Sequence, residues 1–161
     1  MSSDGAKLVR AAAAGDDAKV KRLLKARADV NSTMTGERGT TGITALQNAC
    51  VNGQVGAVRL LLKAKAAVDL RDSGAGSALL GASQAGELKC AQLLIEAQAA
   101  VDQPNDQLST PLTMAAEKGH APGCSVGGAG GELGRATREN AEREALKRTV
   151  WCASRLNPET D

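Results

Sequence analysis

The sequence predicts an all-α fold in which short helix-turn-helix units stack into a solenoid. The first observation is a repeat: the intervals from Gly53 to Gly86 and from Gly86 to Gly119 are both 33 residues, and other positions recur at the same spacing. The second is that the helical patterns in each unit are shorter than the ~12–15 residues that an isolated helix needs in water. Each unit therefore requires neighbours, which the repeat supplies.

The unit at residues 44–69 shows the pattern most clearly. Its first helix begins at Thr44 and ends near Asn52, because Gly53 favours the left-handed conformation that stops a helix. The second helix carries Val58, Leu61 and Leu62 on one face, at the i, i+3 and i+4 spacing of a buried stripe. With a unit on either side, this should be the best-covered part of the array.

Residues 1–31 form a first helix pair, displaced by 38 residues from the second because Gly15 aligns with Gly53. The N-terminal residues Ser2, Ser3 and Asp4 are candidate caps, and acidic Asp16 and Asp17 suit the start of the second helix. Apolar positions predict the inward faces of both helices. They are Leu8, Val9, Ala11, Ala12, Val20, Leu23 and Leu24.

The second helix of this pair also carries a basic run. Its members are Lys19, Lys21, Arg22, Lys25 and Arg27. Such a run can contact phosphate or an acidic partner. The alternative is the solvated face that a terminal repeat needs to stay soluble.

Residues 32–43 contain the five extra residues of the first interval. Three glycines and several threonines cannot continue a helix, so an enlarged connecting loop is expected here. Either Met34, Glu37 and Arg38 contact a partner from this loop, or the segment is a tolerated surface insertion.

The third unit follows a turn at residues 72–74 and runs from Ser77 to Asp102. A fourth begins with Thr110 as N-cap and Pro111 at the first helical position, where its missing N–H costs nothing. The pattern is lost after His120. Residues 121–134 read as a glycine-rich linker and residues 135–161 as a charged tail. Within it, residues 135–156 form either a helix docked on the open edge of the array or a flexible tail.

Composition excludes several classes of function. The formal charge of +2 is balanced, and aromatic residues make up only 1%, which disfavours a nucleic-acid partner or an anionic membrane surface. No apolar stretch is long enough to enter a membrane. Neither a CxxC pair nor a histidine set suggests a metal, so Cys50 and Cys90 are expected as small buried hydrophobes. We expect a cytoplasmic monomer without cofactors, with the nucleus as the alternative compartment.

The fourth unit carries a resemblance to a known family. The segment TPLTMAA at residues 110–116, followed by Gly119-His120, resembles the ankyrin repeat, as do the Val-x-x-Leu-Leu stripes and the Ala-x-Val-Asp endings. The resemblance covers residues 4–120, as repeats at about 4–36, 40–72 and 73–105 and a partial repeat at 106–120. It implies an ankyrin-repeat domain over residues 1–120, with hairpin-like loops connecting the helix pairs.

The chain departs from this family at two kinds of position. The histidine that usually follows TPL, and bonds to the hairpin loop, is replaced by Gln47, Leu80 and Thr113. The loop glycine is replaced by Ala75 and Leu108, so both loops are expected to be distorted and mobile. His120 is expected to be structural, because no nucleophile stands at a recognisable spacing from it.

The resemblance implies a protein-binding module that is not an enzyme, whose concave surface contacts a partner protein. Matching the family's variable surface positions gives a row of polar, small and nearly neutral candidates. They are Thr40, Thr41, Ile43, Val51, Asn52, Arg71, Ser73, Gly76, Gln84, Ala85, Asp106, Gln107, Ser109, Glu117 and Lys118. Two alternatives stay open: a regulatory or targeting subunit of an enzyme, and a structural fragment of a longer array without its own partner.

Overall fold

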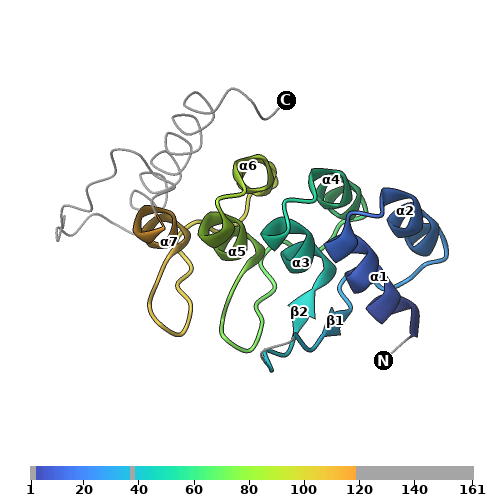
Figure 1. The fold of residues 1–161 in the computed structure, drawn as a ribbon, viewed down its shortest axis with the longest axis horizontal. Coiled ribbons are helices and arrows are strands. Elements are labelled where there is room, and N and C mark those ends of the chain that lie inside the picture. The colour runs from blue at the N-terminus through green and yellow to red at the C-terminus, as the bar shows by residue number, and fades with distance from the viewer. Residues whose placement is uncertain (1–2, 37–38, 119–161) are drawn as a thin grey trace.

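The computed structural model describes residues 3–36 and 39–118. Its helices stack in two rows (Figure 1). The described helices are α1 (Ser3–Ala14), α2 (Asp17–Lys25), α3 (Ala45–Val51), α4 (Val55–Lys63), α5 (Ala78–Ala85), α6 (Leu88–Glu96) and α7 (Pro111–Glu117). Helices α1, α3, α5 and α7 form the inner row, and α2, α4 and α6 form the outer row. The connecting loops project from the inner row, away from the outer one. This is the predicted helical solenoid.

Three connecting segments recur in the array, and we call them hairpin loops. The first spans residues 26–44, the second residues 64–77 and the third residues 97–110. The predicted linker and charged tail, with the two alternatives for residues 135–156, lie outside the described residues. So do His120, Glu37 and Arg38, for which the sequence also made predictions.

The inner helices α3, α5 and α7 begin with the same local chemistry. The hydroxyl oxygens of Thr44 and Ser77 accept hydrogen bonds from the backbone N–H three residues later, at Gln47 and Leu80. Thr110 acts in the same way, because its hydroxyl oxygen accepts from the Thr113 N–H at 3.3 Å. These caps satisfy a helix donor that has no partner within the helix.

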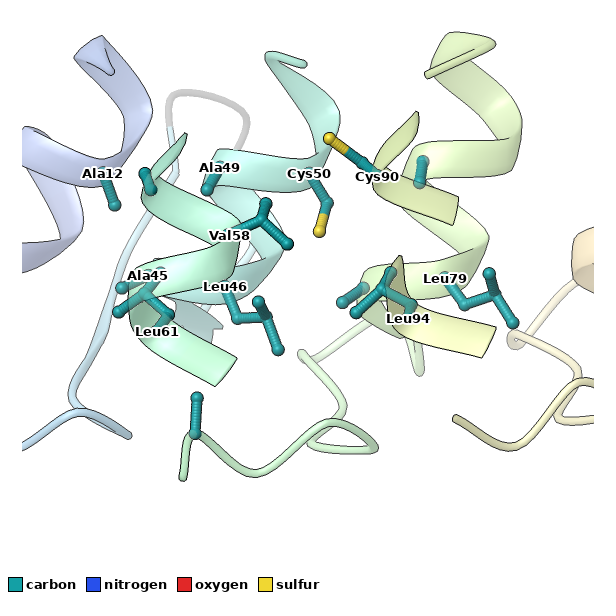
Figure 2. Close-up of a cluster of buried hydrophobic side chains, with 14 of the residues drawn as sticks. Ala12, Ala45, Leu46, Ala49, Cys50, Val58, Leu61, Leu79, Cys90 and Leu94 are labelled. Atoms are coloured by element: carbon teal, nitrogen blue, oxygen red, sulfur yellow. The ribbon is translucent and has the colours of Figure 1, made fainter. Parts of the chain in front are cut away.

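The core lies between the two rows and runs along the whole described array. Leu8, Leu46, Leu61, Leu79 and Leu94 are its largest fully buried leucines. Figure 2 shows how small residues such as Ala45 and Ala49 pack among them. The repeating stripe therefore predicted the buried side of each helix correctly.

Two leucines of the predicted stripes are less buried than expected. Leu24 and Leu62 are half-buried and pack against the rim of the core. Each lies on an outer-row helix, which contacts the inner row along one side only. The edge of its apolar stripe therefore stays near the surface.

The insertion in the first hairpin loop contains two short strands that the sequence did not predict. Strands β1 (Thr33–Met34) and β2 (Ile43–Thr44) pair antiparallel, with Thr33 opposite Thr44 and Met34 opposite Ile43. The pairing closes the inserted residues into a projection from the array. The extra length is thus absorbed without moving α3 from its place beside α1.

The second and third hairpin loops are not distorted, contrary to expectation. Ala75 and Leu108 adopt the left-handed conformation themselves, with φ of 56° and 60°. Each loop closes with the same bonds: the Ala75 N–H donates to Asp72 and the Leu108 N–H donates to Asn105, at 3.0 and 2.9 Å. The surrounding bonds hold the loop geometry, at the cost of a Cβ in an unfavourable region.

Cys50 and Cys90 are buried free thiols, as predicted. Cys50 lies on α3 and Cys90 on α6, so the pair joins two neighbouring repeats (Figure 2). A hydrogen bond with the Cys90 thiol, together with burial, raises the pKa of Cys50 well above its usual range. Both cysteines therefore act as small core residues.

Candidate functional site

The predicted contact residues lie on the hairpin loops and at the C-terminal ends of the inner helices. Ten of them are exposed: Thr41, Val51, Asn52, Arg71, Ser73, Gln84, Ala85, Asp106, Gln107 and Lys118. Thr40, Ile43, Gly76 and Ser109 are half-buried. Glu117 is the last residue of α7, and its side chain is not among those that the structure describes. The structure thus exposes ten of the fifteen candidate positions.

Backbone hydrogen bonds join each hairpin loop to the next. The Ser73 N–H donates to the Thr41 carbonyl at 2.9 Å, and the Thr41 N–H donates to the Ser73 hydroxyl at 3.0 Å. One repeat later, the Asp106 N–H donates to the Gly74 carbonyl at 3.3 Å. The three loops therefore form one connected surface.

Arg71 has a structural role that the sequence did not predict. Its Nε donates to the Ala75 carbonyl at 3.0 Å, and its Nη2 donates to the Pro104 carbonyl in the third hairpin loop. The guanidinium thus links two loops, although the side chain is exposed. A charge reversal at Arg71 would disturb the loops as well as any partner contact.

Gln47 makes a hydrogen bond to the next hairpin loop, in place of the bond that the family's histidine makes there. Its Nε2 donates to the Gly76 carbonyl at 2.6 Å and to the Leu70 carbonyl at 3.4 Å. Its Oε1 accepts from the Thr44 N–H at 2.7 Å. A side-chain amide can donate and accept at once, so glutamine serves both the helix start and the next loop.

Two further side chains, also missed from the sequence, tie the bases of the loops together. Asn31 Oδ1 accepts from the Ala67 N–H and Asp69 Oδ1 accepts from the Ala100 N–H, both at 2.9 Å. The recurring Val-Asn and Val-Asp endings were the signal for this role. A hydrogen-bonding side chain that returns at each repeat boundary indicates a contact with the next unit.

The remaining candidates leave polar side chains available to a partner. Gln84 at the end of α5 and Gln107 in the third loop are exposed and make no side-chain hydrogen bond to the described residues. Beside Gln107 stands Leu108, whose 82% exposure makes it the most exposed large apolar side chain of the described chain. Sequence reasoning treated Leu108 as a loop defect only.

Residues 3–36 and 39–118 contain no group of three His, Cys, Asp or Glu side chains that could hold a metal ion. Within the same ranges, no helix is both long and apolar enough to cross a membrane.

One comparison with known proteins agrees with the stacked helix pairs and the 33-residue period. The family described as ankyrin repeats matches residues 8–105 in three copies, which is more than half of the chain. Nothing among the curated proteins matches the chain. Ankyrin repeats are generally protein–protein interaction modules, and the family is typically non-catalytic. The chain belongs to the ankyrin repeat family.

Proposed function

We propose that this chain binds a partner protein through the surface formed by its hairpin loops and the ends of α3, α5 and α7. The observation that carries the proposal is the bonding of each loop to the next, through Thr41 with Ser73 and Gly74 with Asp106. A surface whose loops are already ordered loses less conformational entropy on binding than three independent loops would. The exposed side chains on it are therefore presented in a fixed row.

The chemistry of the row favours a partner that is recognised by polar contacts around a small apolar anchor. Gln84 and Gln107 supply amide donors and acceptors, and Leu108 supplies apolar area at a loop tip. The row lacks the Trp, Tyr and free Arg that dominate high-affinity interfaces. We therefore expect a modest affinity that depends on several loops acting together.

Site-specific photocrosslinking tests the surface without disturbing the loops. A photoreactive amino acid replaces Gln84 or Gln107 in the full chain, and crosslinked proteins are recovered from cells. The matched control carries the same group at Arg59, which is exposed on the outer-row helix α4. We expect one crosslinked species from both test positions and none from Arg59. Equal crosslinking at Arg59 would place the interface elsewhere.

A further inference from the structure

The outward side of α2 is a basic surface, distinct from the hairpin loops. We define the α2 basic surface as the exposed side chains of Lys19, Lys21, Arg22 and Lys25 on the helix and of Arg27 in the turn that follows it. The helix lies at the N-terminal end of the outer row, where α4 is its one neighbour in that row (Figure 1). These side chains are therefore open to a ligand from outside the array.

The charges of this surface are not neutralised by the described residues. None of its five cations forms an ion pair with another residue of 3–36 or 39–118, and the ion pair between Lys7 and Asp4, at 2.9 Å, is on α1. The two carboxylates at the start of α2 have other contacts. Asp16 caps the helix by accepting from the Lys19 N–H at 2.9 Å, and Asp17 lies against Gly56 of α4. No acidic residue of α4 faces the surface, because α4 contains none.

Stability of the helix does not account for this arrangement. Lys21 and Lys25 stand at i and i+4, and Arg22 and Lys25 at i and i+3, so like charges are neighbours on the helix surface. Such pairs destabilise a helix. The positive charge of Arg22 and Lys25 in the last turn suits the helix dipole, but that benefit needs neither Lys21 nor Lys19.

The equivalent positions of the other outer helices show where the positive charge continues and where it ends. Lys21 and Lys25 correspond to Arg59 and Lys63 on α4, and these to Gln92 and Glu96 on α6. Gln92 donates a hydrogen bond to Glu96 at 3.2 Å, so α6 is neutral to acidic at the same place. The positive charge therefore continues from α2 onto α4 and ends before α6, and it is densest in and just after α2, with five cations.

The surroundings of the surface select one class of ligand. The large exposed apolar side chains of the described chain are Val51, Leu70 and Leu108. Val51 is on α3 and the two leucines are in the second and third hairpin loops, so α2 itself carries no large exposed apolar side chain that could anchor it in a lipid layer. The described residues include no Phe, Tyr or Trp that could stack on an unpaired base, since Trp151, the one such residue of the sequence, lies outside them. A row of cations without apolar or aromatic companions fits carboxylates on an extended chain.

We propose that the α2 basic surface binds an acidic, Asp- and Glu-rich segment of a partner protein. The site is separate from the hairpin-loop surface, so the test of this proposal does not depend on the function proposed for that surface. Long basic side chains reach an extended segment without burying apolar area, so the interaction depends mainly on charge. It should therefore weaken as salt rises and shortens the Debye length.

Fluorescence anisotropy with the full chain and a labelled peptide of alternating glutamate and serine tests this proposal. We expect saturable binding at low salt that Lys21→Glu/Lys25→Glu weakens by about tenfold or more, since two attractions become repulsions. The matched control, Arg59→Glu/Lys63→Glu, makes the same change in net charge one repeat away and should weaken binding less than about threefold. Far-UV circular dichroism checks that both variants fold.

Three outcomes would overturn the proposal. One is no binding of the glutamate peptide at low salt, or equal binding of a peptide with glutamine in place of glutamate. Another is an equal loss in the two double variants, which would indicate a response to net charge alone. The third is tighter binding of a single-stranded oligonucleotide or of phosphatidylserine vesicles, which would assign the surface to a different class of ligand. The photocrosslinking at Gln84 and Gln107 is unaffected by any of these results.

Discussion

The side-chain amide of Gln47 donates a hydrogen bond to the Gly76 carbonyl over 2.6 Å, joining α3 to the second hairpin loop. The same amide accepts from the Thr44 N–H, and Gln47 is buried. Gln47→Leu should lower the free energy of unfolding by about 1–3 kcal/mol, because the Gly76 carbonyl and the Thr44 N–H lose their hydrogen-bond partner. Urea unfolding followed by circular dichroism measures the change.

The control for this change is Gln84→Leu, which removes an amide of the same kind from an exposed position. It should alter stability by less than about 0.5 kcal/mol. If Gln47→Leu proved as mild as Gln84→Leu, the Gln47 bond would not be holding the loop.

Leu61 is fully buried between the rows, whereas its neighbour Leu62 is half-buried. Leu61→Ala should cost about 2–5 kcal/mol, because it removes transfer energy and leaves a cavity. Leu62→Ala should cost clearly less, since part of its side chain is already in water. Chemical unfolding of both variants gives the comparison, and a larger loss for Leu62→Ala would contradict the burial pattern.

Leu108 holds a left-handed conformation with φ of 60° and is 82% exposed. Leu108→Gly removes the Cβ clash, worth about 1–2 kcal/mol, and adds unfolded-state entropy worth about 0.5–1 kcal/mol. The net result should be a small rise in melting temperature. Leu108→Ala keeps the Cβ and should give no rise. A lower melting temperature for Leu108→Gly would mean that the leucine side chain itself stabilises the loop.

The thiols of Cys50 and Cys90 should be unreactive in the folded chain. Both side chains are fully buried, so the reagent cannot reach them in the folded chain. The Cys90 thiol and burial raise the pKa of Cys50, whereas the hydrogen bond with Cys50 lowers the pKa of Cys90, so burial is what protects Cys90. In a variant with Cys124→Ser and Cys152→Ser, Ellman's reagent at mildly alkaline pH should react only as the chain unfolds. Fast reaction under native conditions would show that the core opens locally.

The raised pKa of Cys50 also makes the free energy of unfolding depend on pH. The folded pKa of Cys50 lies above the ordinary thiol value of 9.0, so the unfolded chain loses this proton first as pH rises. The contribution to stability is complete below pH 9.0 and declines above it. Replacing Cys50 with alanine should flatten this alkaline decline, which urea unfolding at several pH values can detect.

The helices could be predicted from sequence because their signals are local. Gly53 and Gly86 adopt positive φ at the expected helix ends, and Val58 and Leu61 are buried as their spacing indicated. These features need only the 3.6-residue period and a residue without a Cβ. The period of 33 residues then fixed which helices are neighbours, and hence the solenoid.

The loops and the candidate site could be predicted only in outline. Exposure of Gln84 and Gln107 followed from their places in the repeat, but the role of Arg71 depends on two carbonyls, one of them 33 residues away. The undistorted loops at Ala75 and Leu108 show the same limit. Local propensity opposes their conformation, and hydrogen bonds across the loop outweigh it.

Two of the bonds between the hairpin loops join main-chain atoms alone, the Ser73 N–H with the Thr41 carbonyl and the Asp106 N–H with the Gly74 carbonyl. Every amino acid except proline offers these groups, and the other bonds between the loops use the side chains of Asn31, Asp69, Arg71 and Ser73, not those of Thr40 and Gln107. Thr40 and Gln107 can therefore be diversified in a combinatorial library while the frame stays in register. The architecture separates the part of the sequence that must stay constant from the part that is free to evolve new specificities.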